Sequence, residues 1–236
     1  MDPIQAGTRI PDITLRVREG GQFVDKTTAE LFAGRTVVLF GLPGAFTPTC
    51  SSAHVPRYEE LHDALAAKGV DEVICTSVND AFVMEAWRED QGVEKVRFLE
   101  DGNGTLARAL GLLVDKSDLG FGSRSWRYSL LIRDGVVEQT FIEPNKPGDP
   151  YEVSDADTML RYLDGQAPDD IVLFTKPGCG HCVRAKEALN ASGRAFIELP
   201  ATPGTLRALP GGSTTPQVYV NGTLIGGADE LIAWLE

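Results

Sequence analysis

The stretch "TVVLFGLPGAFTPTC", residues 36–50, decides the fold of the first part of this chain. It begins as an apolar run rich in β-branched side chains, which is typical of a buried strand. It ends at Cys50, where a helical pattern begins, because apolar side chains then recur three and four residues apart up to Gly69. We therefore expect a strand, a tight loop, and a cysteine at the start of a helix that Pro56 kinks or locally distorts.

Strands and helices alternate along the rest of the chain, on both sides of a polar break. We expect strands at 70–78 and 96–101, a hairpin at 127–143, and helices at 80–92, 105–112 and 153–163. After "DGQAPDD" the pattern restarts with a strand at 171–175, a helix at 182–193, a strand at 195–199, a hairpin at 216–226 and a helix at 228–235. The sequence thus predicts a domain at 1–163, a linker at 164–169 and a domain at 170–236.

The two predicted domains share a layout. Each is α/β, and each places a cysteine, Cys50 or Cys179, just past a buried strand at the start of a helix. We interpret this as two versions of one thioredoxin-like plan, each a mixed sheet flanked by helices.

The composition excludes several classes of function. The 236 residues carry a formal net charge of −12, which argues against nucleic acid or an anionic membrane as a partner. No apolar stretch has the roughly 18 residues of a membrane span, and the N-terminus lacks the pattern of a signal peptide, so we expect a cytoplasmic protein. Four cysteines are too few for a disulfide scaffold, and one CxxC pair with three histidines falls short of a zinc set. We expect no metal site.

Cys50 has the surroundings of a nucleophile. The thiolate is the reactive form of cysteine, and the backbone N–H groups at a helix start favour an anion. Thr47 can present a hydroxyl to the same point, and Pro43 can shield it from water. On these residues alone, a merely buried cysteine at a helix start remains the alternative.

The motifs around Cys50 resemble those of a known family. Pro43, Thr47 and Cys50 match the P-x3-T-x2-C motif of peroxiredoxins. "GLPGAFTPTCSSAHVP", "SVNDAFVMEAW" and "RSWRYSLLIRDGVV" resemble the type II, or peroxiredoxin five, subfamily over nearly all of residues 1–163. The resemblance implies that Cys50 is the peroxidatic cysteine and that Thr47 hydrogen-bonds the peroxide.

The same resemblance implies an active-site arginine. Arg127 fits that role, with Arg124 as the alternative. A guanidinium there favours the thiolate and stabilises charge developing on the peroxide oxygens. For His54 we expect a structural or interface role, and for Cys75 that of a small hydrophobe in a buried strand.

Attack on a peroxide leaves Cys50 as a sulfenic acid. Some type II relatives resolve it with a cysteine in the segment after the last hairpin. Residues 141–160 of this chain contain no cysteine, so we expect an external thiol to take that part.

The second domain carries a CxxC pair in "TKPGCGHCVRAK". We expect Cys179 to be exposed and reactive and Cys182 to be more buried, with half of a zinc site as the alternative. The context resembles a glutaredoxin over residues 169–236, through "TTPQVYVNG" and "IGGADEL". The first of these predicts a cis bond before Pro216.

The glutaredoxin resemblance implies a glutathione site. Backbone beside the cis-proline can pair with the tripeptide, and N–H groups at a helix start can bind its γ-glutamyl carboxylate. The implied site comprises Lys176, His181, Thr215, Pro216, Gly227, Ala228 and Asp229. The pair Gly180-His181 departs from the proline and aromatic residue that glutaredoxins usually carry between their cysteines, and a histidine there can stabilise the thiolate.

Together, the two regions resemble bacterial hybrids of a peroxiredoxin with a glutaredoxin. This implies a peroxidase that reduces hydrogen peroxide and alkyl hydroperoxides, with no permanently bound cofactor and with glutathione as the reducing co-substrate. Two alternatives stay open: a general thiol–disulfide oxidoreductase, and a peroxide sensor that relays oxidation to partner proteins. Because type II relatives usually pair, we expect a homodimer or homotetramer, in which Cys179 serves Cys50 of another chain.

Overall fold

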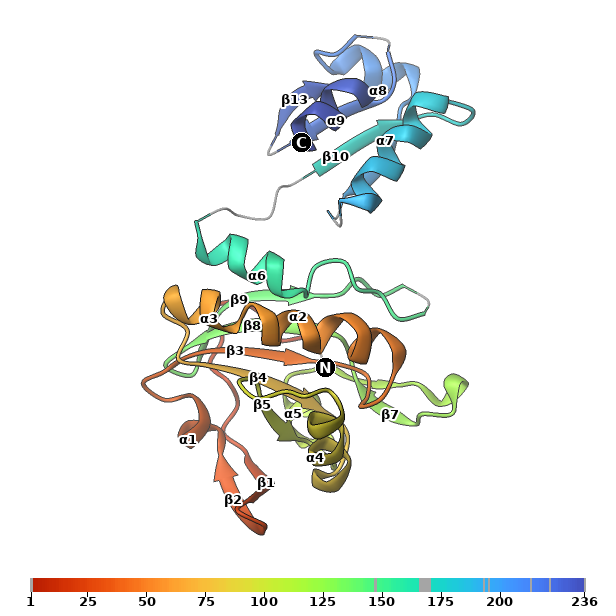
Figure 1. Ribbon diagram of the computed structural model, residues 1–236. Coiled ribbons are helices and arrows are strands. Elements are labelled where there is room, and N and C mark those ends of the chain that lie inside the picture. The colour runs from red at the N-terminus through yellow and green to blue at the C-terminus, as the bar shows by residue number, and fades with distance from the viewer. Residues whose placement is uncertain are drawn as a thin grey trace. The chain divides into compact units, whose positions relative to one another are not determined.

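The computed structural model describes residues 2–146, 148–165, 171–192, 194, 196–212, 214–220 and 222–235. It divides into two compact units, Met1–Gly165 and Gln166–Glu236, called the first and second units below (Figure 1). The expected linker, 164–169, spans this division. Asp164 caps the last helix of the first unit, and residues 166–169 lie outside the described residues.

The first unit is built on a five-stranded mixed sheet (Figure 1). Its strand order is β5 (Arg97–Glu100), β4 (Glu72–Ser77), β3 (Thr36–Gly41), β8 (Tyr128–Arg133) and β9 (Val136–Ile142). The first three of these run parallel, and β8 pairs antiparallel with both β3 and β9. The β8–β9 hairpin turns at Asp134 and Gly135, whose φ angles of 48° and 73° suit a tight two-residue turn.

Neighbouring side chains of β3 fill two different cores, because they point to opposite faces of the sheet. Val38 and Phe40 pack with residues of α2 (Val55–Glu60), α3 (His62–Ala67), α4 (Ala81–Asp90) and α6 (Ala156–Leu163). Val37 and Leu39 pack with residues of α1 (Thr28–Phe32) and α5 (Thr105–Ala109). Figure 1 shows α2, α3 and α6 together on one face of the sheet.

The expectation of one helix from residue 50 to Gly69 is wrong. The segment forms a π-helix, η1 (Cys50–His54), followed by α2 and α3. Because Pro56 lacks an N–H and its ring crowds the carbonyl four residues earlier, the turn before it widens, and the Val55 N–H bonds to the Cys50 carbonyl. The expected distortion at Pro56 is therefore present, and a second break follows at Leu61.

Two hairpins of the first unit were not expected from the sequence. One pairs β1 (Thr14–Glu19) with β2 (Gln22–Thr27), and the other pairs β6 (Leu113–Asp115) with β7 (Ser123–Ser125) around the short 3-10 helix η2 (Ser117–Leu119). Gly20 and Gly21 between β1 and β2 both have positive φ, so a turn signal was present.

The second unit repeats the plan on a smaller scale. Its strand order is β11 (Ile197–Pro200), β10 (Ile171–Thr175), β12 (Gln217–Val220) and β13 (Thr223–Gly226). The helices are α7 (Gly180–Ala191), α8 (Pro203–Ala208) and α9 (Ala228–Leu235), and buried residues of α7 and α9 pack with those of β10 and β12. β10 pairs parallel with β11 and antiparallel with β12. The predicted fold class, two α/β domains with mixed sheets flanked by helices, is confirmed.

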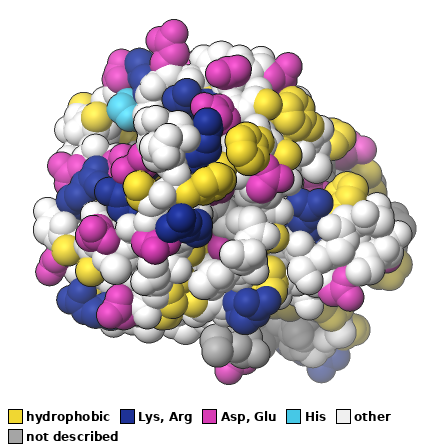
Figure 2. All heavy atoms as spheres, turned by 90° about the horizontal axis from the view of Figure 1, so that it is seen from below, with side chains coloured by type: hydrophobic (Ala, Val, Ile, Leu, Met, Phe, Trp, Pro, Cys, Tyr) yellow, Lys and Arg dark blue, Asp and Glu magenta, His cyan; other side chains and the backbone are white. Residues whose placement is uncertain are grey.

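The surface of Figure 2 mixes both signs of charge. Lys and Arg side chains lie among Asp and Glu on the face shown, with hydrophobic side chains between them. Among the described helices, none has the length and apolar character needed to cross a bilayer. Within the same residues, no group of three or more His, Cys, Asp or Glu side chains could hold a metal ion.

Candidate active sites

Cys50 is the first residue of η1, the helical segment that follows β3 and its loop, and its side chain is completely buried. The loop that leads to it, residues 42–49, is held by the segment just after β4, because the Asn79 Oδ1 accepts the Ala45 N–H at 3.0 Å. Pro43 is buried in this loop, as expected for a residue that shields the sulfur from water. The helical segment that follows, η1, begins at Cys50 itself.

Arg127 is the side chain that reaches the sulfur. It is 1% exposed, and its Nη2 lies 3.5 Å from the Cys50 Sγ. The sheet explains the approach: Gly41 at the end of β3 pairs with Tyr128 at the start of β8, so the residue before Tyr128 lies beside the loop that follows Gly41. The buried guanidinium therefore places a positive charge beside the Cys50 sulfur.

Arg124, the alternative arginine, is held elsewhere. Its Nη1 donates to the Val78 carbonyl at 2.9 Å and its Nε to the Phe121 carbonyl at 3.0 Å. Of the two arginines, the structure therefore brings Arg127 to the sulfur.

Thr47 is half-buried, three residues before Cys50. Its hydroxyl donates to the Gly44 carbonyl at 2.8 Å, and its own carbonyl accepts the Ser51 N–H at 3.0 Å. Because the hydroxyl proton is used in this way, the oxygen is free to accept a hydrogen bond from a peroxide O–H.

The sequence analysis missed Asp149, an acidic partner of Arg127. The Arg127 Nε donates to the Asp149 Oδ1 at 3.2 Å, and Nη2 forms an ion pair with the same carboxylate. Burial acts to lower the pKa of Arg127, but the charge of Cys50 and the bonds to Asp149 raise it overall, so the guanidinium stays charged. No local sequence signal identifies Asp149, which comes from the loop 22 residues after Arg127.

His54 also contacts Arg127, and the sequence analysis did not predict this contact. It is completely buried, its Nδ1 lies 3.0 Å from the Arg127 Nη1, and its Nε2 lies 3.1 Å from the Ser154 carbonyl oxygen. Burial and the neighbouring Arg127 charge hold the pKa of His54 well below its ordinary value, so the ring is neutral. The expected structural role was thus incomplete, because the ring contacts the arginine of the site.

Glu143, a buried carboxylate just after β9, fixes the turn that contacts His54. Its Oε1 accepts the Ser154 N–H at 2.9 Å and the Ser154 hydroxyl at 2.8 Å, and its carboxylate also accepts the N–H groups of Glu152 and Val153. Its own N–H donates to the Arg127 carbonyl at 3.1 Å. One buried side chain therefore ties the 152–154 turn to the strand end that carries Arg127.

Cys75, the other cysteine of the first unit, is completely buried in β4. Burial raises the pKa of its thiol well above the ordinary value, with the charge of Cys50 acting in the same direction. A thiol in this state is a poor nucleophile, as expected for a packing residue.

The second unit holds a disulfide between Cys179 and Cys182. Cys179 is the N-cap of α7 and half-buried, whereas Cys182 is 2% exposed. Lys176 and His181 on either side of Cys179 are exposed. Cys179 is thus less exposed than expected, although it is more accessible than Cys182.

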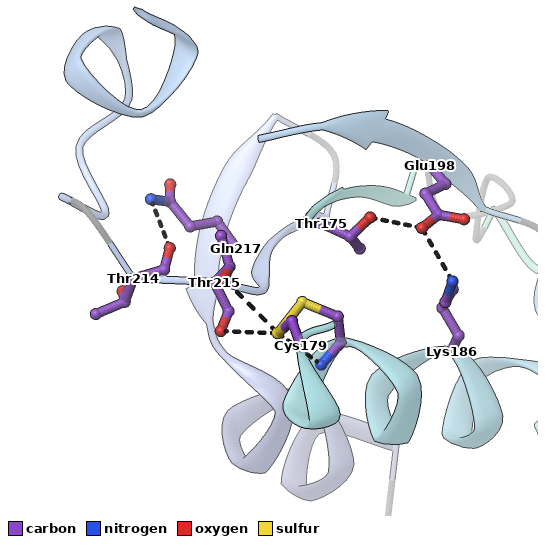
Figure 3. Close-up of a disulfide and its surroundings, with 8 residues drawn as sticks. Thr175, Cys179, Lys186, Glu198, Thr214, Thr215 and Gln217 are labelled. Atoms are coloured by element: carbon purple, nitrogen blue, oxygen red, sulfur yellow. Dashed lines mark hydrogen bonds and ion pairs between the residues drawn. A yellow bond between two sulfur atoms is a disulfide. The ribbon is translucent and has the colours of Figure 1, made fainter. Parts of the chain in front are cut away.

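Thr215 lies in the loop before β12, beside Cys179 (Figure 3). Pro216 follows it directly before β12. The Thr215 Oγ1 lies 3.6 Å from the Cys179 Sγ, and the Thr215 carbonyl oxygen lies 3.5 Å from it. The Thr215–Pro216 peptide bond is cis, as predicted. Gln217, which the sequence analysis did not single out, is buried and donates from its amide to the Gly212 carbonyl at 2.8 Å, so it holds the turn before this loop.

The opposite side of Cys179 is an open pocket of about 450 Å³. In Figure 3, Thr175, Lys186 and Glu198 lie on this side of the disulfide, across from Thr215. Thr175 donates to the Glu198 Oε1 at 2.5 Å, and the Lys186 Nζ lies 3.0 Å from the same oxygen. Lys176 also lines this pocket.

The residues expected at the far end of the glutathione site already have partners within the chain. The Gly227 N–H donates to the Glu230 Oε2 at 2.8 Å, and the exposed Asp229 forms an ion pair with Arg184. Ala228 is buried at the start of α9. A ligand binding here therefore has to displace Glu230 or Arg184.

Comparisons with known proteins identify the families of the two units. Residues 5–160 match the Redoxin family and residues 171–225 match the Glutaredoxin family. The chain is 53% identical over 231 residues to the hybrid peroxiredoxin hyPrx5 of Haemophilus influenzae, covering 95% of this chain and 96% of that protein. It is 54% identical over 174 residues to the peroxiredoxin sll1621 of Synechocystis, covering 68% of this chain and 92% of that protein.

Solved structures resemble the first unit. The crystal structure of reduced Prx3 from Vibrio vulnificus in complex with H2O2 has 47% sequence identity and a TM-score of 0.64, covering 68% of this chain and 99% of that chain. Peroxiredoxin 5 from Alvinella pompejana has 32% identity and a TM-score of 0.60, covering 70% of this chain. The chain therefore belongs to the peroxiredoxin family, as a peroxidase whose Redoxin domain is fused to a Glutaredoxin domain.

Proposed function

We propose that this peroxidase reduces hydrogen peroxide and alkyl hydroperoxides at Cys50 and is recycled by glutathione through Cys179. The observation that carries the proposal is the 3.5 Å approach of the buried Arg127 guanidinium to the Cys50 sulfur. The Vibrio Prx3 structure, which contains H2O2, supports hydrogen peroxide as a substrate of the first unit.

In the first step, the Cys50 thiolate attacks one oxygen of the hydroperoxide. The S–O bond forms as the O–O bond breaks, Cys50 becomes a sulfenic acid, and the alkoxide or hydroxide leaving group takes a proton to give an alcohol or water. Thr47 accepts the hydrogen bond of the peroxide O–H. Arg127 stabilises the thiolate and the negative charge that develops on the leaving oxygen. Pro43 limits access of water to the sulfur.

The sulfenic acid is resolved from outside the first unit. Cys75 is buried in the core, and residues 141–160 contain no cysteine. Glutathione therefore attacks the Cys50 sulfur, water leaves, and a mixed disulfide forms. This step explains why the chain carries a second thiol site.

Cys179 then takes up the glutathionyl group. Its thiolate attacks the glutathione sulfur of the mixed disulfide, which releases the Cys50 thiolate. A second glutathione attacks the same sulfur, which releases Cys179 and oxidised glutathione. Cys182 is not needed in this monothiol route.

Glutathione recognition involves the accessible groups around Cys179. The backbone at Thr215 and Pro216 offers pairing for an extended peptide, and Lys176 offers a cation for a carboxylate. His181, which is exposed between the two cysteines, completes the set of accessible groups. Gly227, Ala228 and Asp229 take part once the amino acid end of glutathione replaces the internal contacts of Glu230 and Arg184, so binding at this end includes a side-chain rearrangement.

The first unit also offers a surface for a second copy of the chain. Phe46 in the loop before Cys50 is 53% exposed, and Phe82, Leu119 and Phe121 are 60%, 53% and 39% exposed. Large apolar side chains in contact with water favour association, which supports a homodimer or homotetramer.

The test is peroxide consumption with glutathione and glutathione reductase as the sole electron supply. Our proposal requires steady turnover by the full chain. Turnover with a dithiol such as reduced thioredoxin but none with glutathione would contradict the glutathione route. A general thiol–disulfide oxidoreductase is favoured instead if a chain without Cys50 consumes peroxide equally well.

A further inference from the structure

The guanidinium of Arg127 has a different neighbour on each side. Its Nη1 contacts the buried His54, its Nη2 faces the buried Cys50 sulfur, and its central carbon lies 5.5 Å from the centre of the Tyr151 ring. The remaining edge, formed by Nε and Nη2, carries the carboxylate of Asp149. Of these four neighbours Asp149 is the most exposed, at 36% of its side chain. This edge is therefore the side on which the guanidinium lies closest to solvent.

The contact between Arg127 and Asp149 has the geometry of carboxylate recognition. Nε donates to Oδ1 at 3.2 Å, and Nη2 forms an ion pair with Oδ2. Two parallel N–H bonds to the two oxygens of one carboxylate form the fork with which arginine binds carboxylate ligands. Because the Asp149 end of the pair is open to water, exchange of this carboxylate for another one costs little. The internal contact thus identifies the ligand chemistry that the edge accepts.

The backbone on both sides of Asp149 is held by other contacts. The Gly148 carbonyl accepts from the Lys116 Nζ at 3.1 Å. On the other side, N–H groups of the 152–154 turn donate to the buried carboxylate of Glu143. The Asp149 side chain can therefore leave the guanidinium by rotation about its own bonds, while the chain on either side keeps these contacts.

Glutathione carries carboxylates that suit this edge. Its sulfur has to reach the Cys50 sulfur, which lies 3.5 Å from the same Nη2 that Asp149 binds. During attack on a peroxide, the Cys50 thiolate and Asp149 are two anions beside one cation. In the neutral sulfenic acid one of these charges is gone, so the positive charge of Arg127 is less compensated and attracts an anionic thiol. The edge therefore gains affinity for a carboxylate at the stage at which glutathione reacts.

We propose that the Nε–Nη2 edge of Arg127 is a carboxylate-binding site for glutathione, at which a carboxylate of the incoming thiol replaces Asp149 during resolution of the Cys50 sulfenic acid. The inference rests on the proposed glutathione route and adds to it a recognition site on the first unit. From this site the glutathione thiolate attacks the Cys50 sulfur, the S–S bond forms as the S–O bond breaks, and the hydroxide that leaves takes a proton to give water. Asp149 returns to the guanidinium once the glutathionyl group has been removed.

The test compares two thiols that differ in their carboxylates. The probes are glutathione and its diethyl ester, in which both carboxylates are blocked. A full-length Cys179→Ser chain, the parent chain, is oxidised with one equivalent of hydrogen peroxide. The second-order rate of mixed-disulfide formation on Cys50 is then measured for each thiol by rapid quenching and mass spectrometry. The ratio of the two rates, glutathione over ester, is compared between variants, so that the intrinsic reactivity of each thiol cancels.

Three substitutions in the parent chain separate carboxylate exchange from other effects. Asp149→Asn keeps an oxygen that can accept one bond from Arg127 but removes the competing charge. Asp149→Glu keeps the competing charge. Glu152→Gln is the matched control, because it removes a carboxylate that is 38% exposed and pairs with Lys146 rather than with Arg127.

Asp149→Asn should raise the ratio about fivefold, the size of an ion pair for which water competes. Glu152→Gln should leave the ratio within about twofold of the parent chain, as is usual for a surface substitution. The ratio for Asp149→Glu should lie nearer to that of the parent chain than to that of Asp149→Asn, because a carboxylate still competes for the guanidinium.

Two outcomes overturn the inference. If Asp149→Asn changes both rates by the same factor, the carboxylate only holds the guanidinium and glutathione does not replace it. If Glu152→Gln raises the ratio as much as Asp149→Asn does, the selectivity reflects the charge of the loop and not a site on Arg127. A third result has a different meaning: if neither thiol forms a mixed disulfide with Cys50 of the parent chain, the proposed glutathione route itself fails, and the recognition site fails with it.

Discussion

The two sulfur sites of this chain stand at the same point of similar folds but in different surroundings. Cys50 is completely buried and has a guanidinium at 3.5 Å, with a carboxylate and an imidazole holding that guanidinium. Cys179 is half-buried, and the groups near its sulfur are neutral dipoles: the Cys182 N–H at 3.2 Å and the Thr215 hydroxyl at 3.6 Å.

The difference corresponds to the partner that each sulfur meets. A hydroperoxide is small and develops negative charge as its O–O bond breaks, so buried positive charge is useful at Cys50. Cys179 instead exchanges sulfur for sulfur with the glutathionyl group, so no oxygen leaves with negative charge at this site and buried positive charge is not needed. The same strand–loop–helix plan thus serves two reactions by changing what lines the loop.

The largest expected effect comes from removing the buried sulfur. Cys50→Ser should reduce peroxide turnover by several orders of magnitude, because a hydroxyl is a far weaker nucleophile at neutral pH. Glutathionyl transfer to small disulfides should stay at the wild-type level, since it needs only Cys179. Parallel assays of the two reactions on one preparation provide the check, and loss of both would contradict the separation of the sites.

The next prediction compares the two cysteines of the second unit. Cys179→Ser should lose glutathione-supported turnover, while Cys182→Ser should keep much of it, because one thiol suffices to exchange a glutathionyl group. Steady-state peroxide consumption with glutathione and glutathione reductase measures both variants. Equally complete losses would indicate a dithiol cycle through the Cys179–Cys182 disulfide.

A third prediction concerns the charge that distinguishes the two sites. Arg127→Gln should lower the rate of Cys50 oxidation by roughly a hundredfold, in the range found when one stabilising donor is removed from a reaction centre. Arg127→Lys should recover only part of the loss, because an ammonium cannot bind Asp149, His54 and the sulfur in one plane. Glutathionyl transfer by Cys179 should be unchanged, and an effect there of similar size would contradict the account.

The smallest expected effect is a pH dependence of stability that only the buried site has. His54 is kept neutral in the folded chain by burial and by Arg127, whereas in the unfolded chain it binds a proton below about pH 6.5. The unfolded state therefore gains protons that the folded state does not, and the free energy of unfolding falls as pH drops below that value. The slope is at most about 1.4 kcal/mol per pH unit.

Urea unfolding of the full chain between about pH 7 and pH 5.5 measures this slope, in a range above the ordinary pKa values of carboxylates. His54→Asn is the control, and its slope should be flatter. Among the groups facing His54, Tyr58 and Tyr151 have raised pKa values through burial, and Arg127 stays charged, so they do not titrate in this range. The same slope in both chains would show that His54 is not kept neutral by the fold.

Much of the fold follows from local sequence. The buried strands at β3 and β10 are uninterrupted apolar runs, and the Asp134-Gly135 turn has the residues that its positive φ angles need. The sequence did not determine how the helix after Cys50 is interrupted, since Pro56 allowed either a kink or a wider turn.

The site residues also divide into those that the sequence predicts and those that it does not. Cys50, Thr47, Cys179 and Cys182 stand in short motifs, which the sequence displays directly. The contacts of Arg127 do not, because His54 lies 73 residues before it and Asp149 lies in a loop 22 residues after it. Only the folded sheet brings these three side chains together, so their spacing in the sequence does not predict the contacts between them.

The most direct test of the account is to identify what is attached to Cys50 after one turnover. A Cys179→Ser chain is treated with one equivalent of hydrogen peroxide and then with glutathione, and its peptides are mapped by mass spectrometry without reduction. We predict a glutathionyl group on Cys50 and nothing on Cys75, since glutathione resolves the sulfenic acid and Cys179 is absent to remove the adduct. A disulfide joining Cys50 to Cys75 or Cys182, with no glutathione on Cys50, would contradict the central claim that an external thiol completes the reaction.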